Sequence, residues 1–245
     1  MTKWVSRTLL LALGAGLAAA LAGCCVPEAS CGCHAKVKTY RSSDFYADGN
    51  FVPEKANQAY FDLMDRFGVP AFEAFKTDKM ADGKTPYFWV TDFAQGDFAA
   101  IGMGGVIYVN EKAEGYFNHD IFLLPGQSIC EHRHLKTVDR ETGRPIPCKM
   151  ESWLVRKGSV YGFSEIGEPN LDKFPEVKAR LAKSQLPHLK CVHVEKWTAD
   201  GRSHKLAAPE TWHFMMAGPE GAVVNEVATF HDGNGLRFSI PSAVF

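Results

Sequence analysis

Three histidines and two glutamates in the second half of the chain could bind a metal ion or transfer a proton. His132 and His134 stand two residues apart, Glu151 and His213 follow, and Glu226 comes last. Imidazole nitrogens and carboxylate oxygens are ordinary ligands of divalent transition metals. A further carboxylate beside such an ion can ligate it or serve as a general base. These residue types therefore predict a catalytic metal site.

The strands expected around these residues would bring them together. Side chains of a strand alternate between its two faces, so His132 shares a face with His134, and Lys149 shares one with Glu151. A hairpin that turns near residues 141–142 would place His132 opposite Glu151 and His134 opposite Lys149. The alternative for Lys149 is a strand-edge position that faces solvent.

A second hairpin is expected later in the chain. A Gly-Pro-Glu-Gly turn at residues 218–221 would join two strands, and pairing Ala217 with Ala222 would set His213 directly opposite Glu226. Glu226 could then act as a base beside the metal. Alternatively, it could hold a ligand histidine by a hydrogen bond.

Four further histidines and Cys130 receive no catalytic role. Cys130 shares the face of His132 and His134, so we expect it to face the site as a small buried residue. We identify no converging partners for the other histidines and interpret them as surface or structural residues: His119, His193, His204 and His231.

Composition places the chain among β-rich proteins with one globular domain. It has 245 residues, of which 46% are hydrophobic and 12% aromatic, with 22 glycines and 13 prolines. This length permits a sizeable core. A net charge of -1 gives no indication of a nucleic-acid partner.

Short apolar runs separated by Gly, Asp and Asn predict a mainly β fold. A helix is expected from Pro53, because apolar residues recur at three- and four-residue spacing as far as Phe67. A second short helix is expected at residues 71–80, and a helix-prone insertion at 169–185. Many short strands with few helices indicate a sandwich or small barrel. The expected strands are 87–91, 98–101, 105–110, 119–124, 150–156, 160–163, 189–198, 211–217, 222–230 and 236–240.

The N-terminus has the pattern of an export signal. Lys3 and Arg7 precede an apolar run that is too short for a good transmembrane span. Leu21-Ala-Gly-Cys24 resembles the bacterial lipobox, which implies an exported protein lipidated at Cys24 and held on the periplasmic or cell-surface side of a membrane. We predict a lipoprotein signal peptide at 1–23, a Cys-containing linker at 24–50 and a barrel domain with N-terminal helices at 51–245.

Two spacing patterns resemble the motifs of the cupin family. They are Gly126-x5-His132-x-His134 with Glu151-x6-Gly158, and Pro209-x3-His213. The resemblance implies a double-stranded β-helix, or jelly-roll barrel, with a metal in its mouth. It also implies four metal ligands, which are His132, His134, Glu151 and His213.

One departure from the cupin pattern affects the choice of ligands. The segment between His134 and Glu151 is longer than the usual cupin spacing, which indicates an extended loop. Glu131 and Glu141 therefore remain as weaker candidates for the carboxylate ligand.

Several segments resemble, more narrowly, the D-lyxose isomerase family of sugar isomerases. They include Leu124-Pro-Gly-Gln127, Lys149-x-Glu151, Pro209-Glu-Thr-Trp-His213 and Gly221-Ala-Val-Val-Asn-Glu226, within residues 87–241. The resemblance implies aldose–ketose isomerisation of a monosaccharide such as D-lyxose or D-mannose. It also implies a divalent metal, most commonly Mn²⁺, although Zn, Fe, Co or Ni would suit the same ligands.

The family resemblance also assigns catalytic roles and an assembly. Glu226 would take a proton from the carbon next to the carbonyl and return it to the neighbouring carbon, while Lys149 would donate to a substrate oxygen. Family members and cupins generally pair, so a homodimer is expected. Two other functions stay open: a non-catalytic carbohydrate-binding lipoprotein, and an Fe(II) cupin oxygenase.

Overall fold

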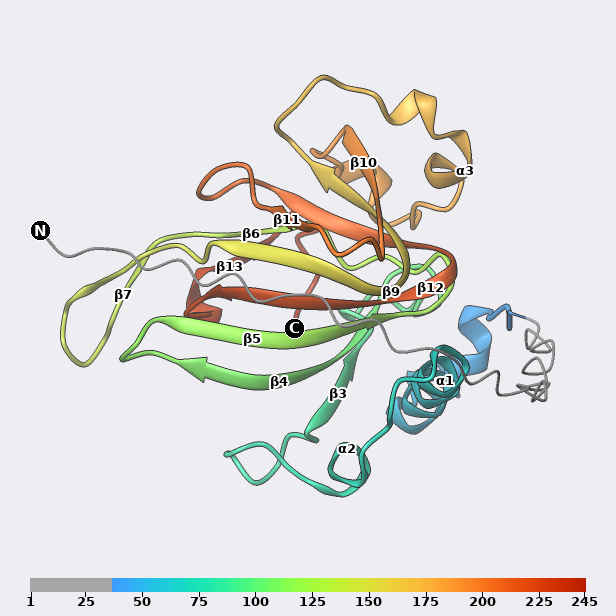
Figure 1. Ribbon diagram of the computed structural model, residues 1–245, viewed down its shortest axis with the longest axis horizontal. Coiled ribbons are helices and arrows are strands. Elements are labelled where there is room, and N and C mark those ends of the chain that lie inside the picture. The colour runs from blue at the N-terminus through green and yellow to red at the C-terminus, as the bar shows by residue number, and fades with distance from the viewer. Residues whose placement is uncertain (1–36) are drawn as a thin grey trace, which may run out of the picture. The chain divides into compact units, whose positions relative to one another are not determined.

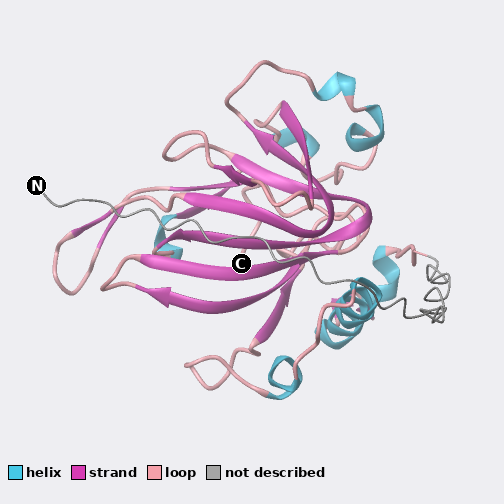
Figure 2. Ribbon diagram, viewed as in Figure 1, coloured by secondary structure: helices cyan, strands magenta, loops and turns pink. Residues whose placement is uncertain are grey.

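Strands are more abundant than helices in residues 37–245, the part of the chain that the computed structural model describes (Figure 2). The helices there are α1 (Pro53–Phe67), α2 (Glu73–Thr77) and α3 (Pro175–Lys178), with 3₁₀ turns at Ser42–Phe45, Leu171–Lys173, Leu186–His188 and Gly233–Gly235. None of these helices has the length and apolar character needed to cross a membrane.

Nine strands form one curled antiparallel sheet, the architecture of a double-stranded β-helix (Figure 1). The strands of this sheet are β3 (Phe88–Thr91), β4 (Met103–Glu111), β5 (Tyr116–Leu123), β6 (His132–His134), β9 (Glu151–Ser164), β10 (His193–Thr198), β11 (Ser203–Lys205), β12 (His213–Thr229) and β13 (Leu236–Phe238). The sheet runs in the order β10-β9-β12-β5-β4-β3, with β11 added to β9, and with β6 paired to both β12 and β13. Two small hairpins stand apart from it: β1 (Tyr46–Ala47) with β2 (Asn50–Phe51), and β7 (Thr137–Val138) with β8 (Pro145–Ile146).

Helix α1 confirms the predicted N-terminal helix and packs against the β3–β4–β5 part of the sheet. Pro53 opens it, and Gly68 ends it in the left-handed conformation with φ of 63°. Its apolar face joins a core cluster with Phe88 of β3. The buried hydroxyl of Tyr60 donates to Oε1 of Gln127 at 2.6 Å, which ties the helix to the loop before β6.

Strands β9 and β12 pair along almost their whole length and curl back on themselves. Glu151 pairs with Ala228 at one end of this ladder, and Ser164 pairs with His213 at the other. If the ladder were straight, thirteen steps of about 3.3 Å would separate Glu151 from Ser164 by about 43 Å. Oε2 of Glu151 nevertheless lies 2.7 Å from Nε2 of His213. The curl of the sheet therefore brings the two ends of the ladder together.

The expected strands correspond to the observed ones with two corrections here and a third, at residues 218–221, described below. The segments at 150–156 and 160–163 are one strand, β9, because the ladder continues through Gly158. The strand predicted at residues 98–101 is wrong, since these residues form turns with an isolated bridge at Ile101. Phe98 is buried against α1 rather than paired in the sheet. The predicted insertion at 169–185 contains only short helical segments.

The first predicted hairpin forms in the expected register but is much shorter than expected. Thr137 pairs with Ile146 and Val138 with Pro145, and the ladder extends no further. His132 pairs instead with His213 of β12 and with Phe238 of β13. The predicted pairing of His132 with Glu151 is therefore wrong, because the barrel offers β6 other partners.

The second predicted hairpin is wrong. Residues 218–221 do not reverse the chain, since Ala217 and Ala222 both pair with β9, opposite Val160 and Gly158 respectively. The segment between them is an irregularity inside the single strand β12. His213 and Glu226 consequently stand at different points of β12 rather than opposite each other.

Replacement of Gly158, which lies at this irregularity, should strongly destabilise the fold. Its φ is 70°, and a β-carbon there would lie 2.1 Å from the backbone oxygen of Gly221. We expect Gly158→Ala to lower the free energy of unfolding by about 3 kcal/mol or more. Gly201, with φ of 83° and no atom within 4 Å of its β-carbon position, is the matched control. Gly201→Ala should cost only about 1–2 kcal/mol. Equal losses in urea unfolding would contradict the steric argument.

Candidate metal centre

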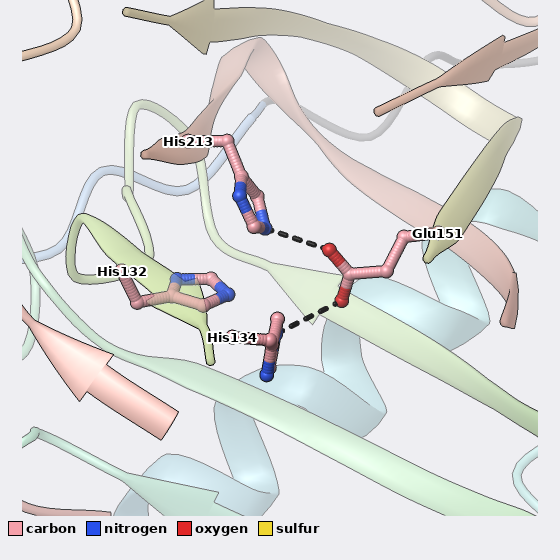
Figure 3. Close-up of side chains that lie close together, drawn as sticks. All are labelled: His132, His134, Glu151 and His213. Atoms are coloured by element: carbon pink, nitrogen blue, oxygen red, sulfur yellow. Dashed lines mark ion pairs between the residues drawn. The ribbon is translucent and has the colours of Figure 1, made fainter. Parts of the chain in front are cut away.

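Four side chains converge inside the curl of the barrel. Each of His132, His134, Glu151 and His213 offers one ligand atom, and these four atoms all lie within 4.8 Å of one another. The two outer histidines of β6 and the first residues of β9 and β12 supply them (Figure 3). The structure thus brings together the four residues that the cupin resemblance proposed as ligands, and their binding of a metal stays a prediction.

Backbone carbonyls orient two of the imidazole rings. Nδ1 of His132 lies 2.8 Å from the carbonyl oxygen of Cys130, and Nδ1 of His213 lies 2.8 Å from that of Thr211. A carbonyl only accepts, so each Nδ1 carries the proton and donates it. This tautomer leaves the Nε2 lone pair of each ring free for a ligand, as is usual for metal-bound histidine.

Several buried polar atoms of the cluster lack a hydrogen-bond partner. They are both ring nitrogens of His134, Nε2 of His213 and Oε2 of Glu151. Nε2 of His213 and Oε2 of Glu151 approach to 2.7 Å without hydrogen-bond geometry. Buried polar groups are rarely left without a partner, and a cation between these atoms would satisfy them. The residues present therefore fit a divalent metal.

The protonation states of His132 and Glu151 suit a cation, whereas the pKa of His213 is raised: burial lowers it, but the charge of Glu151 outweighs burial. A cation at the cluster would take the place of that proton. Burial, together with the neighbouring imidazoles of His213 and His134, holds the pKa of His132 well below its usual value. Burial alone would raise the pKa of Glu151, but the charge of Lys149 and the adjacent histidines hold it well below its usual value. Neutral imidazole and ionised carboxylate are the forms that bind metals.

Lys149 lies between the two glutamates of the site. Its Nζ is 2.9 Å from Oε1 of Glu151 and forms a closer ion pair with Oε1 of Glu226. The other oxygen of Glu226 accepts from Nε1 of Trp153 at 3.1 Å and lies 3.2 Å from Nε2 of His119. Lys149 is only 5% exposed, so the alternative of a solvent-facing lysine is wrong.

The charges of this pair stabilise each other. Burial would raise the pKa of Glu226, but the charge of Lys149 outweighs it and lowers that pKa to about 2. Burial likewise lowers the pKa of Lys149, yet its attraction to Glu151 and Glu226 raises it overall. Glu226 is thus held as a carboxylate and Lys149 as an ammonium.

His119 is a site residue that the sequence analysis missed. It faces its β12 partner Glu226 across the β5–β12 ladder and is 6% exposed, so a surface position is wrong, as is the expectation that it lacks a converging partner. The sequence contained an indication of this position, because the residues at alternate positions around His119 are apolar: Phe117, Ile121 and Leu123. All three are buried in the structure. Alternation along β5 would have placed His119 on the inner face. His231, also interpreted as surface or structural, borders the same cavity.

A cavity of about 130 Å³ adjoins the cluster. His132, His134, Lys149, Glu151 and Glu226 contribute to its wall. Cys130 does not, which corrects the expectation that it faces the site, although it is fully buried as expected.

The weaker candidates for the carboxylate ligand lie elsewhere. Glu131 is fully buried, and its carboxylate accepts hydrogen bonds from the backbone of Lys190 and Cys191. Glu141 is exposed in the turn after β7. Neither belongs to the four-residue cluster, which leaves Glu151 as its carboxylate.

Curated sugar isomerases resemble this chain over more than half of its length. A D-lyxose/D-mannose isomerase of Thermosediminibacter oceani is 31% identical over 152 residues, which are 62% of this chain and 76% of that protein. A D-lyxose ketol-isomerase of Cohnella laeviribosi is 31% identical over 140 residues, or 57% of this chain and 69% of that protein. No model of a known protein family matches the chain.

Solved structures confirm the fold. The L-ribose isomerase of Acinetobacter sp. DL28, in complex with L-ribose, superposes with a TM-score of 0.55 and 16% identity, and the match covers 78% of this chain and 92% of that one. The L-ribose isomerase of Cellulomonas parahominis with L-ribose gives 0.52 at 14% identity over 76% and 90% of the two chains. The curled antiparallel sheet agrees with the predicted cupin barrel. From its identity with curated members over more than two thirds of their length, this chain belongs to the D-lyxose isomerase family of aldose–ketose sugar isomerases.

Proposed function

We propose that this protein interconverts an aldose and a ketose, with a monosaccharide of the D-lyxose or D-mannose type as substrate and a divalent metal as cofactor. The main support is the buried contact of Lys149 with both Glu151 and Glu226 at the wall of the cavity. Proton transfer between adjacent carbons needs an acid–base pair beside a group that stabilises oxygen charge.

Glu226 is the base in this proposal, and Lys149 is the donor. Glu226 removes the proton from the carbon next to the substrate carbonyl and returns it to the neighbouring carbon, which passes through an enediol. Lys149 donates to the substrate oxygen that gains negative charge. A substrate oxygen that takes over the Lys149 contact would weaken its ion pair with Glu226 and make that carboxylate more basic.

His132, His134, Glu151 and His213 would hold the metal. A divalent cation there would act as a Lewis acid on the carbonyl and stabilise negative charge on its oxygen. Three imidazoles and one carboxylate suit Mn²⁺, which we propose, and also Zn, Fe, Co or Ni.

The two other functions have less support in the arrangement of the residues. A carbohydrate-binding lipoprotein has no need of a buried lysine between two glutamates, which is an expensive arrangement to desolvate. An Fe(II) oxygenase could use the same four metal residues but has no role for the contact between Lys149 and Glu226.

We further propose that the protein is exported, lipidated at Cys24 and held on the periplasmic or cell-surface side of a membrane, and that it forms a homodimer. Cys24 and the signal peptide lie outside the described residues, so this part rests on the Leu21-Ala-Gly-Cys24 pattern. The dimer would cover an exposed edge of the sheet.

Removal of divalent metal should abolish isomerisation, and addition of Mn²⁺ should restore it. The purified protein would be treated with a chelator, assayed with D-lyxose and D-mannose, and reloaded with each of the five metals. Because the metal binds the folded protein and not the unfolded chain, adding it should also raise the melting temperature. Full activity of a protein without measurable metal would contradict the proposal.

Glu226→Gln should lower kcat by about 10²–10⁴-fold, because it removes the base while keeping the size of the side chain. Metal content should be unchanged, since Glu226 is not among the four ligands. Glu131→Gln is the matched control: it changes another fully buried glutamate that lies outside the cavity. It should alter stability rather than kcat, and near-normal turnover by Glu226→Gln would refute the assigned base.

Cys24→Ser should release the protein from the membrane fraction and prevent incorporation of labelled fatty acid. The control variant Cys25→Ser, one residue further on, should stay in the membrane fraction and still incorporate the labelled fatty acid. A Cys24→Ser protein that still carries the label would rule out this lipidation site.

A further inference from the structure

The cavity beside the metal cluster is divided into a polar and an apolar part. Its polar part is formed by three members of the cluster (His132, His134 and Glu151), the Lys149–Glu226 pair, His119 and His231. Much of the remainder is formed by five residues that we call the apolar wall: Trp89, Phe93, Met103, Phe238 and Phe245.

The apolar wall begins directly at the cluster. The ring of Phe238 lies 6.2 Å from that of His132, centroid to centroid, and 5.6 Å from that of Phe93. Trp89 and Phe245 continue the wall, with their rings 5.0 Å apart. A chain-like molecule whose reacting carbons face Lys149 and Glu226 would therefore extend along these rings.

Among the described residues, the wall offers one polar group to such a molecule. Nε1 of Trp89 is buried and has no hydrogen-bond partner. The other members of the wall carry phenyl rings or a thioether, which are poor partners for hydroxyl groups. Outside the wall, Nε2 of His119 contacts Glu226, while the Nδ1 atoms of His119 and His231, in the polar part, have no hydrogen-bond partner.

This division is unfavourable for a fully hydroxylated sugar. An open-chain pentose or hexose has a hydroxyl on each carbon beyond the reacting pair, and one pressed against phenyl rings loses its hydrogen bonds to water. A terminal methyl group gains from the same contact. An apolar pocket discriminates against one added hydroxyl by up to about 100-fold.

We infer that the preferred substrate is a deoxy aldose whose chain ends in a methyl group that lies against the apolar wall. The indole N–H of Trp89 donates to one hydroxyl in the middle of the chain. This inference rests on the proposed isomerase function and narrows its substrate class.

Matched sugars test the inference by turnover. The Mn²⁺-loaded protein would be assayed with 6-deoxy-D-mannose and D-mannose, which form the same ring type and differ by one hydroxyl. We expect kcat/KM to favour the deoxy sugar by about 10- to 100-fold. Equal values, or a preference for D-mannose, would overturn the inference even if isomerisation itself is established.

A binding measurement separates the inference from the proposed reaction. Mannitol and 6-deoxymannitol have no carbonyl, so they neither react nor close into rings, and their Kd values can be compared by calorimetry. Tighter binding of the deoxy compound would support the apolar wall as a recognition surface even if no sugar is isomerised. Equal affinity, or no binding of either compound at millimolar concentration, would overturn the inference.

Met103 offers a variant with a matched control. Met103→Gln keeps the length of the side chain but adds an amide to the wall, and should reduce the preference for the deoxy compounds several-fold. Met103→Leu keeps the wall apolar and should preserve it. An unchanged preference in a folded Met103→Gln protein would argue against the wall as its source.

Discussion

The curl of the β9–β12 ladder is the constraint on which the rest of the structure depends. Glu151 and His213 stand at opposite ends of that ladder, yet their side chains meet. Only a sheet that turns through a closed path can achieve this, and close backbone approach at Gly158 and Gly221 is part of that turn. Strand β6 then adds His132 and His134 by pairing with the start of β12. The cluster is thus assembled by barrel closure rather than by any local motif.

A second consequence of closure is a buried group of charges that balance one another. Apart from the imidazoles, two glutamates and Lys149 leave one net negative charge in the site. Desolvation of such a group is unfavourable unless each charge is paired and hydrogen-bonded. Trp153 and His119 supply the remaining contacts of Glu226. The excess negative charge, together with the orphaned atoms of His134 and His213, favours a cation at the cluster.

The two parts of the cavity derive from the same alternation of side chains. Inward positions of β5 carry Phe117 and Ile121 on either side of His119, so a single polar residue interrupts an apolar face. The four candidate ligands stand at the ends of β6, β9 and β12. Trp89 and Met103 of the apolar wall come from β3 and β4 instead. Candidate ligands and this part of the recognition surface are therefore supplied by different strands.

The sequence by itself determined the residue types, the mainly β class and helix α1, because each follows from local spacing and alternation. It also carried enough family resemblance to nominate the four candidate ligands together with Lys149 and Glu226. It could not decide which strands pair, since alternation is the same whichever partner a strand finds. The expected partner of His132 was Glu151, and the observed ones are His213 and Phe238. The tertiary structure decided that residues 218–221 continue β12, and that His119 meets Glu226, because those contacts depend on the closure of the whole barrel.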